Sequence, residues 1–189
     1  MHHLRVSRRL ENLLGALAVG LSDAISSAVE TTTGHAGAMG AALATLAQEP
    51  GLSIEQLRMP LGRTQSATVR LVDQLVADGH AERRPGRDHR SVAVVLTPKG
   101  AAAAGRVLAS RERALSDAVG ALTPGERKAL TVTLEKVLAR ITTGRAHADQ
   151  ICRRCDLAAC PEPACPVALA ARDRQQQVSG RSEKEVIRP

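Results

Sequence analysis

The sequence contains no phenylalanine, tyrosine or tryptophan among its 189 residues. A packed core must therefore consist of leucine, valine, isoleucine and alanine, and 43% apolar residues are enough to form one. Small side chains each bury little area, and burial contributes only about 25 cal/mol per Å². We therefore expect a single chain to be weakly stable and to gain stability from a dimer interface.

Three further features are missing, and each argues against a class of protein. The N-terminus has no charged stretch followed by an apolar run and a cleavage site, so no signal peptide is predicted. The most apolar window, residues 13–29, is too short for a membrane span and carries Asp23 and several serines. The histidines are dispersed, and no spacing places a nucleophile beside a base. The sequence thus predicts a cytoplasmic protein that is not an enzyme and not in a membrane.

Residues 53–66 have the pattern of two short helices joined by a tight turn. Ser53 and Gln56 form a capping box, which predicts a helix start. Pro60 and Gly62 predict its end, because proline disfavours helical geometry in the preceding residue and glycine permits the turn. Thr64 is predicted to cap the second helix.

The second helix has an apolar side and a polar side. The apolar positions that recur at helical spacing are Ala67, Leu71, Val72, Leu75 and Val76. The other side carries Gln65, Ser66, Val69, Arg70 and Asp73. A polar face with an arginine is what a helix needs to read a DNA groove.

A basic hairpin follows. Residues 81–84 lead into the turn cluster 85–88, residues 91–96 form a β-branched return strand, and Thr97 with Pro98 opens the next helix. From Arg58 to Lys99 the chain has eight Lys/Arg and four Asp/Glu, within a net charge of +7. This arrangement predicts a winged helix-turn-helix with a charge that suits phosphate neutralisation.

These residues resemble the MarR family of dimeric transcription regulators over roughly residues 4 to 143. The motifs that carry the resemblance are Gly62 to Ala67, Arg70 to Asp73, Glu82-Arg83-Arg84, and the wing signature Asp88-x-Arg90 followed by Val94-x-Leu96-Thr97-x-x-Gly100. Two features depart from the family. Family members usually have an apolar residue followed by a polar one at the positions of Thr68 and Val69, and here the order is reversed. This chain also has no aromatic residues.

The resemblance implies a mainly α-helical homodimer that binds a palindromic operator in double-stranded DNA. The residues expected to contact DNA are Arg63, Thr64, Gln65, Ser66, Val69, Arg70, Arg84, Arg87 and Arg90. Arg70 can pair with guanine, Gln65 with adenine, and Val69 can touch a thymine methyl. At the wing, Arg87 and Arg90 would follow the backbone or enter the minor groove. Relatives often bind small, frequently aromatic effectors between dimer helices and winged domain, but this chain has no aromatic side chain to stack on one.

Amphipathic helices flank the winged domain. One stripe at helical spacing consists of Leu10, Leu14, Leu17, Leu21, Ile25 and Val29, and another of Leu130, Leu134, Val137, Leu138 and Ile141. Both would be exposed in a monomer, so we expect them to pair across a two-fold axis. The predicted organisation is an N-terminal dimerisation helix (1–34), the winged helix-turn-helix with its two-stranded wing (35–100), C-terminal dimerisation helices (101–145), a cysteine segment (146–172) and a disordered tail (173–189).

All four cysteines lie within fourteen residues, as Cys152-x2-Cys155-x4-Cys160-x4-Cys165. Incidental thiols and disulfides are alternatives, but so local a cluster in a cytoplasmic chain favours metal ligation. The gaps match a zinc knuckle whose histidine is replaced by cysteine, although the usual glycine and aromatic residue are missing. Cysteine–proline pairs at positions 160 and 165 place an iron–sulfur cluster slightly ahead of zinc.

The sequence therefore predicts a transcription regulator that responds to redox state or metal through this cluster. Two other functions remain open. One is a thiol–disulfide or electron-transfer protein built on Cys152 and Cys155, although the βαβ context usual for that motif is missing. The other is a protein-binding winged helix without DNA activity.

Overall fold

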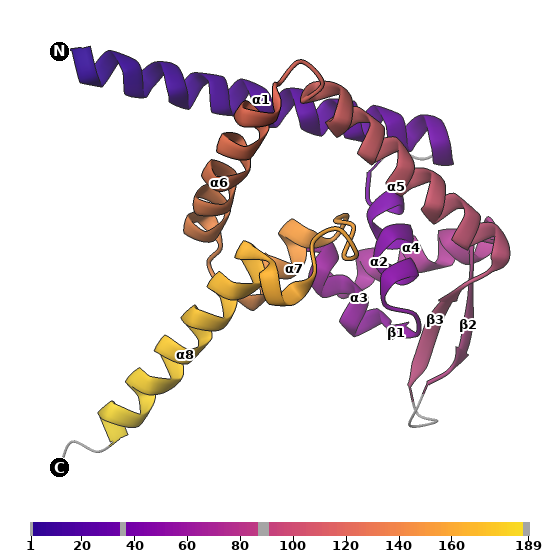
Figure 1. Ribbon diagram of the computed structural model, residues 1–189. Helices are drawn as coiled ribbons and strands as arrows, with labels where there is room; N and C mark the ends of the chain where they lie inside the picture. Colours follow the sequence, from indigo (N-terminus) through magenta and orange to yellow (C-terminus); the bar gives the residue numbers. More distant parts are fainter. Residues whose placement is uncertain (1, 35–36, 87–90, 187–189) are drawn as a thin grey trace.

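The computed structural model describes residues 2–34, 37–86 and 91–186, and it is mainly helical with one small antiparallel sheet (Figure 1). The elements in chain order are α1 (His2–Thr33), α2 (Met39–Gln48), β1 (Leu52–Ser53), α3 (Ile54–Leu61), α4 (Gln65–Ala77), β2 (Ala81–Pro85), β3 (Val92–Leu96), α5 (Pro98–Ala118), α6 (Pro124–Ile141), α7 (Arg145–Cys152), the 3₁₀ turn η1 (Glu162–Ala164) and α8 (Pro166–Val186). The predicted mainly α-helical winged helix-turn-helix is confirmed.

The helix-turn-helix forms where the capping residues predict it. The Gln56 backbone N–H donates to Ser53 Oγ at 3.2 Å, and the Ser53 N–H donates to Gln56 Oε1 at 2.9 Å. Gly62 ends α3 with φ +61°, a left-handed conformation that favours glycine. The Ala67 N–H donates to Thr64 Oγ1 at 3.3 Å and begins α4. Local sequence signals therefore fix the turn that precedes α4.

The wing belongs to a three-stranded sheet rather than a free hairpin. The strand order is β1-β3-β2, with Arg83 of β2 opposite Val94 of β3 and Leu52 of β1 on the other side of Val94. The sequence prediction missed β1, because two residues are too few to show the alternation of a strand. This third strand joins the wing to the start of α3.

The winged domain has an aliphatic core, as the absence of aromatic residues predicts. Its buried members come from α1, α2, α3, α4, the sheet and α5. The largest fully buried leucines are Leu43, Leu46, Leu57 and Leu75. The core includes Val72 and Leu75 of α4, and α4 packs mainly against α3 and β2 within one chain.

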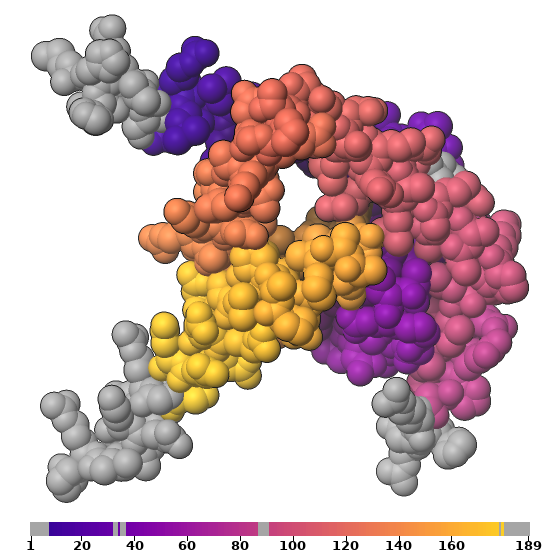
Figure 2. Space-filling model, in the orientation of Figure 1, coloured from indigo at the N-terminus to yellow at the C-terminus, as the bar shows by residue number. Residues whose placement is uncertain are grey.

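The flanking helices bury much less. Large apolar side chains exposed on α1 and α6 are Leu10, Leu13, Leu14, Leu17, Val19, Val132, Leu134 and Ile141. No residue of α6 is buried. In Figure 2 an opening passes through the molecule between α6, α5 and the cysteine segment, which the chain does not fill. These exposed faces match the surfaces predicted to form a dimer.

Residues 8–31 of α1 are long and apolar enough to cross a membrane by length and composition alone. The argument from sequence that the apolar window is too short therefore does not hold, because the helix continues on both sides of it. Only 6% of the window is buried in the single chain. It offers a large apolar face to a partner.

The C-terminal region forms a second, smaller core. Its buried residues are Ala148, Cys165, Val167 and Ala171, with Leu138 of α6 packed against them. The predicted disorder over 173–189 is a further difference, since α8 continues to Val186 and residues 187–189 lie outside the described part. Glutamine, arginine, glutamate and lysine are frequent here, and all are good helix formers.

Candidate DNA-binding surface and cysteine segment

The predicted reading face of α4 and the turn before it is open to solvent. Of the expected DNA contacts in this region, Arg63, Thr64, Gln65, Ser66 and Arg70 are exposed, and Val69 is half-buried. α4 places Gln65, Ser66 and Arg70 within its first two turns. The helix therefore presents hydrogen-bonding side chains near its N-terminus, as a major-groove helix does.

The inversion at Thr68 and Val69 does not disturb the packing of α4. Thr68 is fully buried, and its hydroxyl donates to the Thr64 carbonyl at 3.0 Å. The polar atom is therefore satisfied within the helix while its methyl group joins the core. Val69 lies at the edge of the exposed face, where it can contribute an apolar contact.

The wing is tied to the reading helix by an ion pair that the sequence prediction did not identify. Arg83 of β2 donates to Asp73 of α4 at 2.7 Å. Arg84 is exposed and pairs with Glu82 on its own strand. The predicted wing contacts Arg87 and Arg90 lie outside the described residues. Arg83 thus positions the wing against α4. The sequence indicated this only through Asp73, the acidic residue on the polar face of α4.

The cysteine segment brings its four thiols together through a series of tight turns. The Cys155 N–H donates to the Cys152 carbonyl at 2.8 Å, the Cys160 N–H to the Asp156 carbonyl at 3.0 Å, and the Cys165 N–H to the Glu162 carbonyl at 3.2 Å. Cys165 is buried and the other three are half-buried. Cys152 and Cys160 pack against the core that contains Cys165.

The pKa values of three of the thiols are shifted in different directions. The Cys152 thiol bonds to the Cys155 sulfur, which lowers the pKa of Cys155 to about 6 against the effect of burial, with help from the Arg111 guanidinium. The same bond, with burial, raises the pKa of Cys152. Burial, followed by a hydrogen bond to Cys165, raises the pKa of Cys160 to about 11.

The thiols belong to one small core, and Cys155 follows Cys152 across a tight turn. Cys152 and Cys160 lie against the buried Cys165. Within the described ranges, no group of three or more His, Cys, Asp or Glu side chains is arranged as a metal site. The Nδ1 atom of His147 accepts from the Thr143 N–H at 3.2 Å.

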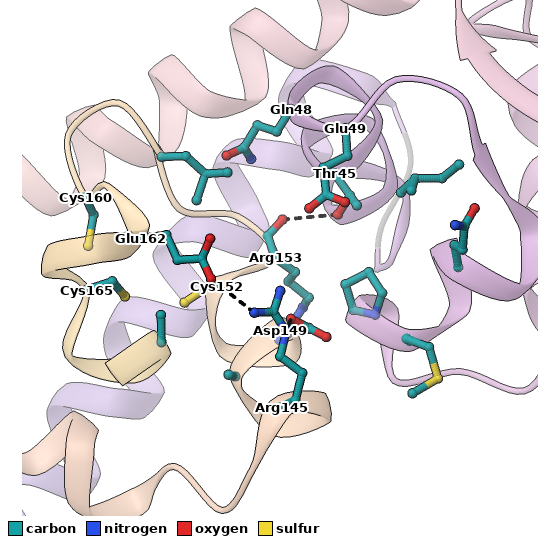
Figure 3. Close-up of a pocket in the computed structure, with 17 residues that line it drawn as sticks. Thr45, Gln48, Glu49, Arg145, Asp149, Cys152, Arg153, Cys160, Glu162 and Cys165 are labelled. Atoms are coloured by element: carbon teal, nitrogen blue, oxygen red, sulfur yellow. Dashed lines mark hydrogen bonds and ion pairs between the residues drawn. The ribbon is translucent and has the colours of Figure 1, made fainter. Parts of the chain in front are cut away.

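A cavity of about 380 Å³ lies between the winged domain and the cysteine segment (Figure 3). Cys152, Cys160 and Cys165 contribute to its wall from one side, and Thr45 and Gln48 of α2 contribute from the other. Across its lower edge Arg145 bonds to Asp149 at 2.9 Å and to Glu162 at 3.3 Å. The cavity therefore connects three thiols to solvent.

The cysteine segment also touches the helix-turn-helix directly. A Cβ atom added at Gly62 would lie 3.3 Å from the Gln150 side chain of α7. Thr45 Oγ1 donates to the Arg153 carbonyl at 3.4 Å, and Arg154 donates to the Gly37 carbonyl at 3.2 Å. The turn before α4 thus contacts α7, the helix that carries Cys152. No local sequence pattern predicts this contact.

Comparison with known proteins places the architecture in a family. The sequence profile of the MarR family matches residues 40–91. A MarR family transcriptional regulator from Silicibacter pomeroyi is 32% identical, with a TM-score of 0.56, and the match covers 72% of this chain and 94% of that protein. The chain belongs to the MarR family. No curated protein sequence matches it.

Other MarR family structures agree in fold. A MarR family protein from Bacillus stearothermophilus is 25% identical, with a TM-score of 0.64, over 74% of this chain and 97% of that one. Apo MarR from E. coli is 25% identical, with a TM-score of 0.54, over 66% of this chain and 96% of that one. MarR family members are transcription regulators that bind DNA as dimers. Since these matches cover the relatives almost completely, about a quarter of this chain or more is additional to them.

Proposed function

We propose that this protein is a homodimeric MarR-type regulator that binds a palindromic operator in double-stranded DNA. The observation that carries the proposal is the α4 face, where Gln65, Ser66 and Arg70 are exposed together while the opposite side is packed in the core. Two such helices related by a two-fold axis would enter successive major grooves. The half-sites should lie about one helical turn apart, roughly 10 bp centre to centre.

The dimer would form through the apolar faces of α1 and α6. Together these helices expose more large apolar side chains than a soluble monomer usually displays in one region. Pairing with a second chain would also cover the apolar window of α1, so a cytoplasmic dimer accounts for that window without a membrane. We therefore assign both helices to the interface.

The cysteine segment is proposed to tune DNA affinity in response to metal or redox state. Its contacts at Gly62, Thr45 and Gly37 support this role, because they reach the helix-turn-helix and the helix beneath it. A cluster of cysteine ligands suits an iron–sulfur cluster or zinc, and reversible disulfide formation is the metal-free alternative. In each case a change in the cluster would move α7 against the turn that positions Arg63 and Thr64. A small effector in the adjoining cavity would act on the same contacts.

A thiol–disulfide function is the second candidate, favoured by the lowered pKa of Cys155 beside Cys152. Against it, Cys152 is the last residue of α7, and the negative end of a helix disfavours a nearby thiolate. Turnover of a disulfide substrate with a thiol reductant tests this candidate directly.

The experiment that tests the main proposal is selection of binding sites from random DNA, followed by affinity measurements over a range of salt concentrations. We expect an inverted repeat and an affinity that falls steeply with salt. Arg70→Ala should cost about 1–3 kcal/mol on the selected site and relax one base preference. Arg106→Ala removes the same charge from α5, the helix that packs on α1, and should leave base preference unchanged. Selection that returns no repeat, or equal effects of both variants, would contradict the proposal.

A further inference from the structure

We propose that the cavity between the winged domain and the cysteine segment binds a small aliphatic amine in its protonated form. This inference rests on the proposed function, because it names the class of effector that would act on the contacts between α7 and the helix-turn-helix. The cavity is the one shown in Figure 3, and its volume of about 380 Å³ is in the range of small-molecule sites.

The walls of this cavity come from the winged domain and the C-terminal segment. α2, β1 and α3 form one side, and residues 145–168 form the other. In the described part of the chain, no residue of α1, α5 or α6 lines it. The effector position that the MarR resemblance implies lies between the dimer helices and the winged domain. This cavity is therefore a separate site, and a single chain completes it.

Two helices end at the cavity, and both present their C-terminal ends to it. α2 ends at Gln48 and α7 ends at Cys152, and both of these residues line the wall. The capping residues Glu49 and Arg153 line it as well, and Thr45 Oγ1 joins the two ends by donating to the Arg153 carbonyl at 3.4 Å. The last carbonyl groups of a helix carry partial negative charge, which favours a cation nearby. The ends of the two helices therefore favour a positively charged ligand.

The charged side chains of the wall favour the same sign. Three carboxylates and two guanidinium groups line the cavity: Glu49, Asp149, Glu162, Arg145 and Arg153. Arg145 bonds to Asp149 at 2.9 Å and to Glu162 at 3.3 Å. The Arg153 guanidinium donates to a backbone carbonyl of α7. Among the described residues, Glu49 has no ion-pair partner, so its carboxylate is the charge that a cationic ligand would offset.

A buried acceptor in the wall indicates what the head group of the ligand supplies. The Gln48 Oε1 atom is buried and has no hydrogen-bond donor within the described ranges. The Nε2 atom of the same amide donates to the Ala44 carbonyl at 3.3 Å, so the oxygen is the atom left to be satisfied. An ammonium N–H can donate to it, and a charged donor gives the stronger hydrogen bond. A quaternary ammonium has no N–H, and the chain has no aromatic side chain to bind one by its ring face.

The rest of the wall suits a short hydrocarbon chain. Its apolar side chains include Leu52, Met59, Pro60 and Leu157. Met59 is 38% exposed and Leu157 is 44% exposed, so a ligand between them would cover apolar surface of the protein as well as its own. A linear alkyl chain has no polar group that would have to be desolvated there. The structure thus assigns the site to an alkylammonium ion with its head group beside Gln48 and Glu49.

The test is isothermal titration calorimetry of the reduced full-length protein with probes that share a hexyl chain. The probes are hexylammonium, hexyltrimethylammonium, hexanol and hexanoate. We expect saturable binding of hexylammonium, binding about tenfold weaker or less for the quaternary ion and the alcohol, and none for hexanoate, because only the first probe is both a cation and an N–H donor. Equal affinity for the amine and the alcohol, binding of hexanoate instead, or no binding of hexylammonium at millimolar concentration would overturn the proposal.

Two variants locate the head group. Gln48→Leu replaces the buried acceptor with an apolar side chain of similar size, and it should weaken hexylammonium binding about tenfold. The free energy of unfolding without ligand should stay the same or rise, because the unsatisfied oxygen is removed. Glu49→Gln should weaken binding about two- to fivefold, since an exposed carboxylate attracts a cation less strongly.

The matched control is Glu112→Gln. It removes the same charge from an exposed position of α5, which does not line the cavity, and should leave amine binding unchanged. Unchanged binding in Gln48→Leu, or equal weakening in Glu49→Gln and the control, would contradict the assignment of the head group. None of these readouts involves DNA, so the amine site can fail while the protein still selects an inverted repeat, and the reverse.

Discussion

The winged domain and the helices that flank it bury their leucines to very different extents. Leu43, Leu57 and Leu75 have no exposed surface, whereas Leu10 of α1 is 66% exposed and Leu134 of α6 is 40% exposed. The residue types are similar, so composition does not explain the difference. The winged domain completes its core within one chain, and the flanking helices need a second chain. A substitution should therefore act on folding in the first region and on assembly in the second.

The largest effect is expected from a charge in the flanking helices. Leu134→Glu would place an unpaired carboxylate in the dimer interface, twice by symmetry, at a cost of about 3–5 kcal/mol per buried charge. Sedimentation should find a monomer, and high-affinity operator binding should be lost. Lys136→Glu introduces the same residue on the opposite side of α6 and should leave the dimer intact. A Leu134→Glu protein that stays dimeric with unchanged DNA affinity would remove α6 from the interface.

A smaller effect separates two glycines of α5 within the winged domain. A Cβ atom at Gly100 would lie 1.8 Å from the His80 carbonyl oxygen, whereas one at Gly105 would meet nothing within 4 Å. Gly100→Ala should therefore lower the free energy of unfolding by about 3 kcal/mol, because backbone must move. Gly105→Ala should raise it by about 0.5–1 kcal/mol through helix propensity. Urea unfolding at fixed protein concentration measures both, and similar values for the two variants would contradict the close approach.

The smallest effect comes from the same type of cap in the two regions. Ser53 begins α3 and Thr123 begins α6, each through a capping box. Replacement of either residue by alanine should cost about 1 kcal/mol. For Ser53→Ala the loss should appear at any protein concentration. For Thr123→Ala it should appear mainly as weaker dimerisation, since no residue of α6 is fully buried in the single chain. Equal concentration dependence for both variants would break the proposed division between the regions.

Local signals were sufficient to predict much of the fold. Ser53, Thr64, Thr97 and Thr123 each cap the helix that the sequence assigned to them. Capping depends on residues three apart, so one sequence contains the information. The strand β1 and the extension of α8 were missed, because a two-residue strand has no period and a polar helix has a composition that also suits disorder.

Contacts between distant segments could not be predicted in the same way. Gly62 and the Gln150 side chain lie close together although they are far apart in the sequence. Neither residue type indicates which partner it will have. The pairing of Arg83 with Asp73 is similar, since either side chain could equally have remained in solvent. The sequence indicated that the cysteines act together, but it did not indicate that the segment carrying them lies against the helix-turn-helix.

The central claim is that the state of the cysteine segment changes DNA affinity through its contact with the helix-turn-helix. The most direct test compares operator affinity of the metal-loaded and metal-free full-length protein, both reduced, at one salt concentration. A coupling of typical size, about 1–3 kcal/mol, predicts a difference of about 5- to 150-fold between the two forms. Equal affinity of the two forms would contradict the claim, and the cysteine segment would then have no part in regulating DNA binding.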